Sequence, residues 1–333
     1  MTATIKDVAE HAGLSVTTVS RFLNNHPYIS EDKKVRILAA MKALDYEPSI
    51  AAQQMRGVKS HRIGILVSRI TNPFFANLVD ALEVTARKNG YSVLIVQNHD
   101  SVGEEANCLD LLKKKIIDGL ILCSVESDKA VLEKYQQHGP ILLCNTRVDG
   151  ADLPVVRVDD EEATFNAMGY LLEQGYQKIA YCTGGDFLQK GHGERRNRGF
   201  LRAMTAAGRT VDNELIFRRL HTYKDGIRLA EQLAELPSSA RPDVVFTGSD
   251  DVACGLVTWL TNHDIRVPQD IAVVGFDNLP VSEMVSVPIT TVNQPVDKLG
   301  QFSVEYLIAL ITGKPYRYNS DDLKAELVLR KSA

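Results

Sequence analysis

The feature that most constrains the fold is an alternation of short apolar runs with helix-length segments from about residue 62 to the C-terminus. The runs are IGILVS (63–68), YSVLIV (91–96), GLILC (119–123), PILLCN (140–145), KIAYC (178–182), DVVFTG (243–248) and IAVVGFD (271–277). Helical segments are predicted near 74–89, 103–115, 161–174, 195–207, 225–236, 251–263 and 297–311. Such alternation indicates parallel sheets covered by helices on both faces. Because seven strands exceed one small sheet, we predict two doubly wound lobes.

The N-terminal residues follow a different, helical period. Apolar side chains at Ile5, Val8, Ala9 and Ala12 fall on one face of a short helix, and Thr4 with Asp7 fits a Thr-x-x-Asp cap. Gly13 is suited to a turn. Two short helices joined by a glycine-containing turn make a helix-turn-helix.

The second helix is predicted from Val16 to about Leu23, capped by Ser15. Its periodicity turns Val19 and Phe22 towards the core and Val16, Thr17, Ser20 and Arg21 outwards. A third helix opens at Ser30-Glu31-Asp32, with Ser30 as the N-cap, and ends near Leu44. We expect Val35, Leu38 and Ala39 to form its inward face.

Four stretches together resemble one family. IKDVAEHAGLSVTTVSRFLNN, LDYEPSIAAQQMRG, VVGFDN and TTVNQP are similar to the lac repressor and galactose repressor family of bacterial transcription regulators. The resemblance runs from Thr4 to the C-terminus. It implies an N-terminal all-α helix-turn-helix head piece and an α/β core resembling periplasmic sugar-binding proteins.

The resemblance also sets the expected domain boundaries. They are a DNA-binding domain at 1–48, a hinge helix and linker at 49–60, and an effector-binding and dimerisation core at 61–333. Within the core, the N-lobe is expected at about 61–157 plus 290–316, and the C-lobe at about 158–289 plus 317–333. The three crossovers between lobes are expected near 157–160, 289–294 and 316–320.

The segment after the third helix is expected to be a conditional hinge. Pro48 interrupts that helix, and the following IAAQQMRG is too short to hold a helix alone in water. In the family, this hinge helix folds against the minor groove beside its dimer mate. The transferred minor-groove residues are Ala52 and Met55, and Met55 occupies the position of a wedging leucine. An apolar Met can still unstack a base step. The plainer alternative is a solvated linker.

The remaining DNA contacts follow from the same resemblance and from side-chain chemistry. Val16, Thr17 and Arg21 are expected to read base edges in the major groove of a pseudo-palindrome, one half-site per protomer of a homodimer. Residues expected to contact phosphates are Thr4, Ser15, Thr18, Ser20, Asn24 and Ser30. Dimerisation is expected around Phe75 to Ala86 and through Val252 to Leu260.

An effector should bind between the lobes, where the carboxyl ends of the strands meet. The residues expected to contact it are Ser68, Phe74, Phe75, Asn145, Arg196, His221, Ser249, Asp250 and Asp277. A guanidinium and a carboxylate suit the vicinal hydroxyls of a sugar, and an aromatic ring suits its C–H face. Alternatively, Asp250 only caps a helix, Ser68 only ends a strand and Arg196 only forms a surface ion pair.

Two departures from the lactose-binding pattern bear on the ligand. Asn145 stands where that pattern has an acid, and His221 stands at an aromatic wall position that Tyr223 could take instead. The site is therefore expected to take a different sugar or a phosphorylated one. A non-sugar, nucleobase-like ligand and a phosphocarrier protein partner stay open as alternatives.

Composition excludes several other classes. No apolar run approaches the roughly 20 residues that span a bilayer, and no hydrophobic leader is present, so no membrane partner and a cytoplasmic location are expected. The net charge of −4 hides an asymmetry, because residues 1–60 carry eight Lys/Arg against six Asp/Glu. Five scattered cysteines without C-x-x-C indicate buried free thiols, not a metal site.

Catalysis is the rival function for an open α/β sheet. The chain lacks G-x-G-x-x-G after the first strand, a G-x-x-x-x-G-K-[ST] loop and a G-x-S-x-G elbow. The glycine loop at Thr183 lacks a phosphate-gripping lysine, and the acidic cluster from Asp159 to Glu162 fits a helix N-terminus better than a metal site. We therefore expect a regulator without a cofactor, with an enzyme or a transport-type sugar-binding protein as the weaker alternatives.

Overall fold

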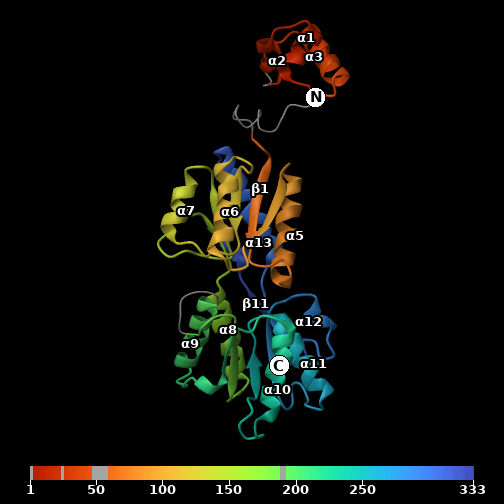
Figure 1. The fold of residues 1–333 in the computed structure, drawn as a ribbon. Coiled ribbons are helices and arrows are strands. Elements are labelled where there is room, and N and C mark those ends of the chain that lie inside the picture. The colour runs from red at the N-terminus through yellow and green to blue at the C-terminus, as the bar shows by residue number, and fades with distance from the viewer. Residues whose placement is uncertain (1–2, 24–25, 47–58, 188–192) are drawn as a thin grey trace. The chain divides into compact units, whose positions relative to one another are not determined.

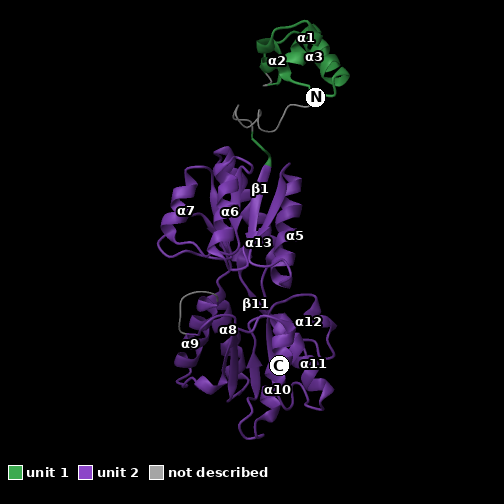
Figure 2. Cartoon of the chain, viewed as in Figure 1, with its two compact units in different colours: residues 1–61 green, residues 62–333 purple. Residues whose placement is uncertain are grey.

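A computed structural model of the chain describes residues 3–23, 26–46, 59–187 and 193–333. It forms two compact units, residues 1–61 and residues 62–333 (Figures 1 and 2). No helix among these described residues is both long and apolar enough to cross a membrane.

Unit 1 contains three short helices around a small apolar core. They are α1 (Ile5–Ala12), α2 (Val16–Leu23) and α3 (Glu31–Ala43). Val8, Val19 and Ile37 are fully buried where the three helices meet. The inward faces predicted for α1 and α2 are therefore confirmed.

The predicted inward face of α3 is wrong. Val35 and Leu38 are 64% and 55% exposed, whereas Ile37 and Ala40 are buried. The sequence of α3 carries two apolar stripes, and packing against α1 and α2 selects the one that contains Ile37. Arg36 reinforces this choice, because its Nη2 donates to Ala12 O at 2.6 Å and to Gly13 O at 3.1 Å.

The turn between α1 and α2 requires glycine for two reasons. Gly13 has a φ of 62°, in the left-handed region, and a Cβ there would lie 2.7 Å from Arg36 Nη2. A larger residue would strain the backbone and displace the guanidinium that ties the turn to α3.

The first lobe of unit 2 contains a five-stranded parallel sheet in the order β2-β1-β3-β4-β5. The strands are β1 (Arg62–Val67), β2 (Ser92–Gln97), β3 (Gly119–Leu122), β4 (Ile141–Cys144) and β5 (Val155–Val156). Its helices are α5 (Pro73–Lys88), α6 (Val102–Lys113), α7 (Lys129–Gln136) and α13 (Val296–Thr312). Helices α5 and α13 cover one face of the sheet, and α6 and α7 cover the other.

The second lobe contains six strands in the order β11-β10-β9-β8-β6-β7, parallel except for β11. They are β6 (Ile179–Thr183), β7 (Ile216–Arg218), β8 (Val244–Phe246), β9 (Ala272–Asp277), β10 (Thr290–Asn293) and β11 (Glu326–Val328). Its helical elements are α8 (Asp160–Glu173), α9 (Glu194–Ala206), α10 (Tyr223–Glu235), α11 (Asp250–Asn262), α12 (Val281–Met284) and the 3₁₀ turn η1 (Asn213–Leu215). Helices α8 and α9 lie on one face of this sheet, with α10 and α11 on the other. The predicted pair of doubly wound lobes is therefore confirmed.

The crossovers between the lobes differ from those expected. Strand β10 lies in the second sheet, beside β9, so 290–293 belong to the C-lobe and not to the N-lobe. Tyr318 and the short 3₁₀ turn η2 (Ser320–Leu323) pack into the first lobe, so the last crossover follows Leu323. The expected crossovers came from the family resemblance, because these segments carry few apolar residues and have no periodicity of their own to place a boundary.

Candidate functional site

Helix α2 presents an exposed face of small and cationic side chains. Val16, Thr17 and Arg21 are exposed, while Val19 is fully buried on the opposite side and Phe22 packs partly against the core. This is the orientation that the periodicity predicts for a helix reading base edges. The exposed Arg21 guanidinium has the fork geometry that pairs with guanine O6 and N7.

Hydroxyl caps hold the N-termini of α1 and α2. Thr4 donates from its backbone N to Asp7 Oδ2 at 2.7 Å and accepts from Asp7 N at 3.5 Å, which confirms the predicted capping box. These bonds from Thr4 lower the pKa of Asp7. Ser15 Oγ accepts from Thr18 N at 3.2 Å, as predicted for the cap of α2. Both helix N-termini are thus fixed and solvent-facing, as phosphate contacts require.

Four other predicted DNA-contacting positions have different outcomes. Ser30 is the N-cap residue of α3, as predicted, but its side chain forms no capping hydrogen bond. Asn24 and the hinge residues Ala52 and Met55 lie outside the described residues.

In unit 2, Arg196 lies in the first turn of α9 and reaches the carboxyl ends of two strands. Its Nη1 donates to Gly248 O at 2.5 Å, just beyond β8, and its Cζ lies 4.8 Å from the centroid of the Phe276 ring in β9. No ion pair to Arg196 is present among the described residues. This placement favours an interior binding role over a surface salt bridge.

A hydrogen-bonded chain joins predicted effector residues of the two lobes. Asn145, which follows β4 in the first lobe, donates from Nδ2 to Gln294 Oε1 at 3.0 Å. Gln294 donates from Nε2 to Asp277 Oδ1 at 2.7 Å, at the end of β9 in the second lobe. Burial raises the pKa of Asp277 well above its usual range, and nearby Asp250 raises it further. Gln294 was not predicted as a site residue, although the TTVNQP stretch contains it.

The structure favours structural roles for Asp250 and Ser249 over the predicted effector contacts. Asp250 is fully buried, and its carboxylate accepts from Leu279 N at 2.6 Å and from Thr291 Oγ1 at 2.5 Å. Both carboxylate oxygens are therefore already bound within the second lobe. Ser249 Oγ accepts from Val252 N at 3.4 Å and caps α11.

The aromatic and imidazole candidates also differ in whether they are buried in a core or remain available to a ligand. Phe74 is buried in the core of the first lobe, whereas Phe75 is only partly buried, with 5.5 Å between the two ring centroids. Phe75 is thus the better candidate for a stacking wall. His221 lies against the loop after β6, since a Cβ on Gly184 would lie 2.9 Å from His221 Cε1. Ser68 is buried directly after β1.

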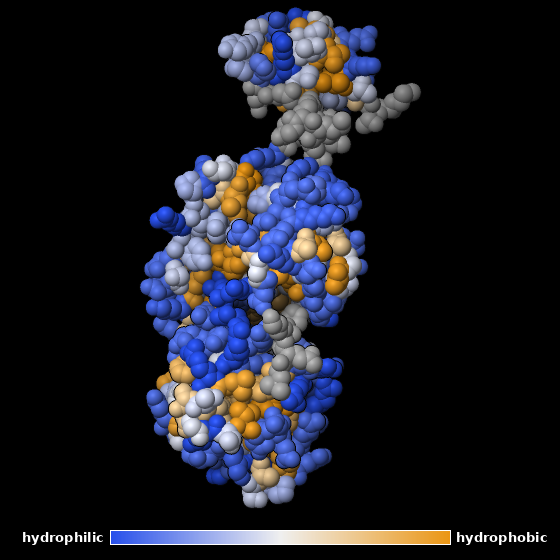
Figure 3. Space-filling view, turned by 90° about the vertical axis from the view of Figure 1, so that its left-hand side faces the viewer, coloured by the Kyte–Doolittle hydropathy of each residue, from blue (hydrophilic) through white to orange (hydrophobic). Residues whose placement is uncertain are grey.

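Buried polar atoms without a hydrogen-bond partner gather beyond the carboxyl ends of the strands. Among the described residues they are Asn98 Nδ2, Ser127 Oγ, Arg157 Nη1, Asp160 Oδ1, Thr183 Oγ1 and Arg195 Nε. Native chains rarely leave such atoms unsatisfied without a functional reason. On the face drawn in Figure 3, the surface where the two lobes meet is mainly hydrophilic. Donors and an acceptor both occur in the set, as a polyhydroxylated ligand requires.

Comparison with known families decides the identity of the chain. Residues 4–49 match "Bacterial regulatory proteins, lacI family", and residues 60–330 match "Periplasmic binding proteins and sugar binding domain of LacI family". The chain belongs to the lacI family. It is a transcriptional regulator with a helix-turn-helix head piece and a ligand-binding domain, and its named lacI-family relatives are regulators, not enzymes.

Individual lacI-family members match along nearly their whole length. The NTD biosynthesis operon regulator NtdR of Bacillus subtilis is 34% identical over 330 residues, covering 99% of each chain. A lacI-family regulator of Lactobacillus casei, solved with bound glucose, is 37% identical, with a TM-score of 0.76 over 82% of this chain and 99% of its own. The lac repressor dimer, solved with operator and the anti-inducer ONPF, is 26% identical, with a TM-score of 0.80 over 100% of this chain and 99% of its own.

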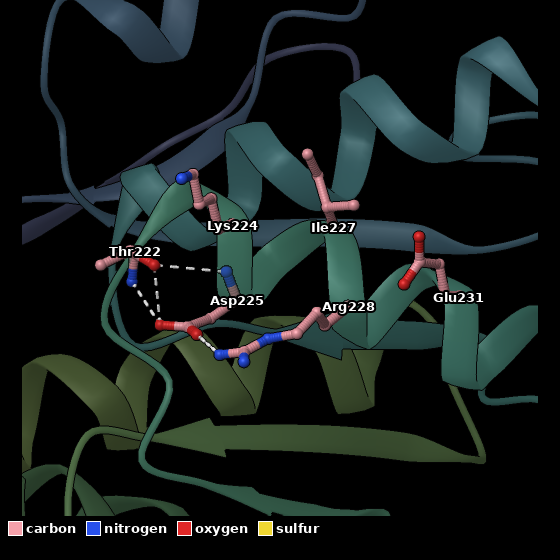
Figure 4. A pocket seen from close by; sticks show the side chains of 6 residues that line it. All are labelled: Thr222, Lys224, Asp225, Ile227, Arg228 and Glu231. Atoms are coloured by element: carbon pink, nitrogen blue, oxygen red, sulfur yellow. Dashed lines mark hydrogen bonds and ion pairs between the residues drawn. The ribbon is translucent and has the colours of Figure 1, made fainter.

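Two surface hollows of this lacI-family chain lie away from the predicted effector residues. One, of about 400 Å³, lies along α10 (Figure 4). There Asp225 pairs with Arg228 and accepts from Thr222 Oγ1 at 2.9 Å, so its carboxylate is occupied within the helix. The other, of about 520 Å³, lies between α5 and α13. Neither is lined by the strand ends where the unsatisfied polar atoms gather.

Proposed function

We propose that this regulator represses a carbohydrate-utilisation operon, binding a pseudo-palindromic operator as a homodimer and responding to a small sugar or sugar derivative. The effector binds between the lobes of unit 2. The observation that carries the proposal is the grouping of Arg196, Asp277 and Asp160, whose buried Oδ1 has no hydrogen-bond partner among the described residues, at the strand ends of the second lobe.

The proposed DNA contacts use the exposed face of α2. Val16, Thr17 and Arg21 read base edges, and the capped N-termini at Thr4 and Ser15 contact phosphates together with Thr18, Ser20, Asn24 and Ser30. Ala52 and Met55 enter the minor groove, with Met55 as the apolar wedge. Operator affinity should therefore fall as the salt concentration rises.

The proposed effector contacts centre on Arg196, Asp277 and Asn145, with Phe75 as the stacking wall and Ser68 and His221 at the margins. The Asp277 carboxyl, whose pKa is raised by burial, lies beside the Arg196 guanidinium, and this combination of a carboxyl and a guanidinium suits the hydroxyls of a sugar. The relatives support a polyhydroxylated ligand, since the Lactobacillus casei regulator was solved with bound glucose and also with bound sucrose.

A non-sugar effector is the second candidate. The support for it is that the relatives include repressors named PurR, one of them 31% identical over 332 residues and 99% of this chain, and that name does not refer to a sugar. Either class of ligand would use the same strand ends.

For the homodimer we propose apolar contacts other than those expected through Val252 to Leu260. The apolar side chains of Val252 to Leu260 face α10 and are buried within the second lobe, so α11 offers little apolar contact. Leu94 and Ile95 on the edge strand β2 are 37% and 44% exposed, and Met284 on α12 is 78% exposed. These side chains can gain burial against a second copy.

Effector binding would change how the lobes meet around the Asn145–Gln294–Asp277 chain and thereby the spacing of the two hinges. The test is a thermal-shift screen of the full chain against sugars, sugar acids, sugar phosphates and nucleobases. A ligand at 100 times its dissociation constant should add about 2.7 kcal/mol to the unfolding free energy. A sugar that stabilises wild type but not Asp277→Ala supports the proposal; stabilisation by nucleobases alone would favour the second candidate.

A further inference from the structure

The loop after β6 meets the start of α9 through glycine backbones. Gly193 precedes α9 with a φ of 82°, and a Cβ there would lie 2.8 Å from Thr183 Oγ1 and 3.9 Å from Gly184 N. A Cβ on Gly248, at the end of β8, would lie 4.0 Å from the same Gly184 N. We call Thr183, Gly184, Gly193 and Gly248 the glycine cradle. The three glycines let the backbones after β6, after β8 and before α9 pack closely together, which brings the Thr183 hydroxyl against the N-terminus of α9.

Two independent features of the cradle point to a missing acceptor. The N-terminus of α9 has no side-chain cap, because its N-cap is Gly193. Thr183 is 2% exposed, and its hydroxyl has no hydrogen-bond partner among the described residues although it faces that same N-terminus. Unpaired N–H groups and the helix dipole at such an end attract anions.

The charges around the cradle favour an anion as well. The Arg196 guanidinium reaches it, bonded to Gly248 O at 2.5 Å. Two nearby carboxylates are paired, Glu194 with Arg198 at 3.2 Å and Asp159 with Arg195 at 2.6 Å, and burial raises the pKa of a third, Asp160, which interacts with Arg196. Burial also raises the pKa of Asp277 well above its usual range, which disfavours a negative charge on that carboxyl.

We propose that the glycine cradle, the N-terminus of α9 and Arg196 form a subsite for a phosphoryl group. The effector is then a phosphorylated sugar. This inference rests on the proposed function, because it names the chemical class of the effector. A phosphoryl group offers three acceptor oxygens in tetrahedral directions, which matches a hydroxyl, helix N–H groups and a guanidinium converging from different elements. A planar carboxylate presents its acceptor sites in one plane, which matches donors converging from different elements less well.

The experiment uses inorganic phosphate as the probe on the full chain. Melting temperature is measured against phosphate concentration at constant ionic strength, with sodium chloride as the balancing salt. A saturable rise is expected for wild type, and Thr183→Val should weaken the apparent phosphate affinity at least fivefold. The matched control is Thr290→Val, another buried threonine of the same sheet, whose hydroxyl is bonded to Ala333 O. It should respond to phosphate like wild type.

A second pair of variants tests the guanidinium. Arg196→Gln should abolish the phosphate response, whereas Arg202→Gln, on the same helix but paired with Glu162, should retain it. A response that is absent in wild type, or equal in Thr183→Val and wild type, overturns the subsite.

Companion titrations with glucose, gluconate and glucose 6-phosphate distinguish a failure of the phosphoryl subsite from a failure of the proposed sugar response. Tighter binding of glucose 6-phosphate than of glucose, lost in Thr183→Val, supports the phosphoryl subsite. Binding of glucose or gluconate without any preference for the phosphate contradicts the subsite and leaves the proposed sugar response intact. If none of these compounds binds and only nucleobases do, the proposed sugar response itself fails.

Discussion

Asn145 donates from its side-chain Nδ2 to Gln294 Oε1 across 3.0 Å, although the two residues are 149 positions apart. Asn145 follows β4 in the first lobe, and Gln294 lies on the crossing between β10 and α13. Gln294 passes the connection on to Asp277 in the second lobe. The state described by this structure therefore has its two central effector candidates already joined through one glutamine. A ligand that contacts Asn145 and Asp277 must compete with that glutamine or include it.

The first prediction concerns this glutamine. Gln294→Ala leaves Asn145 Nδ2 and the buried Asp277 without their partner, so the unfolding free energy of unit 2 should fall by about 1–3 kcal/mol. Denaturant unfolding of the full chain measures the loss. Gln301→Ala, which removes a partly buried glutamine whose bond to Glu305 stays within α13, should change stability by less than about 0.5 kcal/mol. Equal losses in the two variants would remove the special role of Gln294.

The second prediction concerns base reading by α2. Arg21→Ala should weaken binding to the operator by about 1–3 kcal/mol and relax the preference at one base position, because a bidentate guanine contact is lost. Fluorescence anisotropy with the operator and a set of single-base variants measures both quantities. Binding to non-specific DNA should change far less. Unchanged discrimination at every position would exclude Arg21 from base reading.

The third prediction concerns the dimer surface. Replacing Leu94 and Ile95 together by lysine puts two charges into the proposed apolar contact and should shift the protein from dimer to monomer in sedimentation experiments. Val131→Lys on α7, where the side chain is similarly exposed, should leave the dimer intact. A dimer that survives the double substitution would place the interface elsewhere.

The fourth prediction concerns Asp250. Burial raises its pKa to about 7, above the unfolded value of 3.8, so the folded protein holds this proton more tightly than the unfolded chain. The stabilisation is complete below about pH 4 and is lost as the pH rises through 7. In Asp250→Asn, the unfolding free energy should therefore fall less between pH 4 and pH 7 than in wild type. Parallel pH profiles for the two proteins would contradict a raised pKa in the folded state.

Periodicity predicted most of the fold because long elements bury one defined face. The inward sides of α1 and α2 and the central strands of both sheets follow directly from it. It failed at α3, where two apolar stripes compete and only the packing of Ile37 against α1 and α2 decides. It also missed β5, β7, β10 and β11, which are two to four residues long and carry too few apolar positions for a period.

The candidate site was predictable only in part. The rule that ligands bind at the carboxyl ends of strands identified Ser68, Asn145 and Asp277 correctly as strand-end residues. It could not separate Asp250, whose carboxylate is bound within the second lobe, from Asp277, because both acids follow a strand. Gln294 was missed because its importance depends on two partners that lie far away in the sequence.

The measurement that tests the central claim most directly is operator affinity with and without the compound that raises the melting temperature. Wild type and Asp277→Ala are compared as full chains by fluorescence anisotropy. We predict that the compound changes the dissociation constant of wild type by roughly 5- to 150-fold, in either direction, and leaves that of Asp277→Ala unchanged. The two proteins should bind the operator equally well without the compound. A compound that binds wild type yet leaves its operator affinity unchanged would contradict the coupling of this site to DNA.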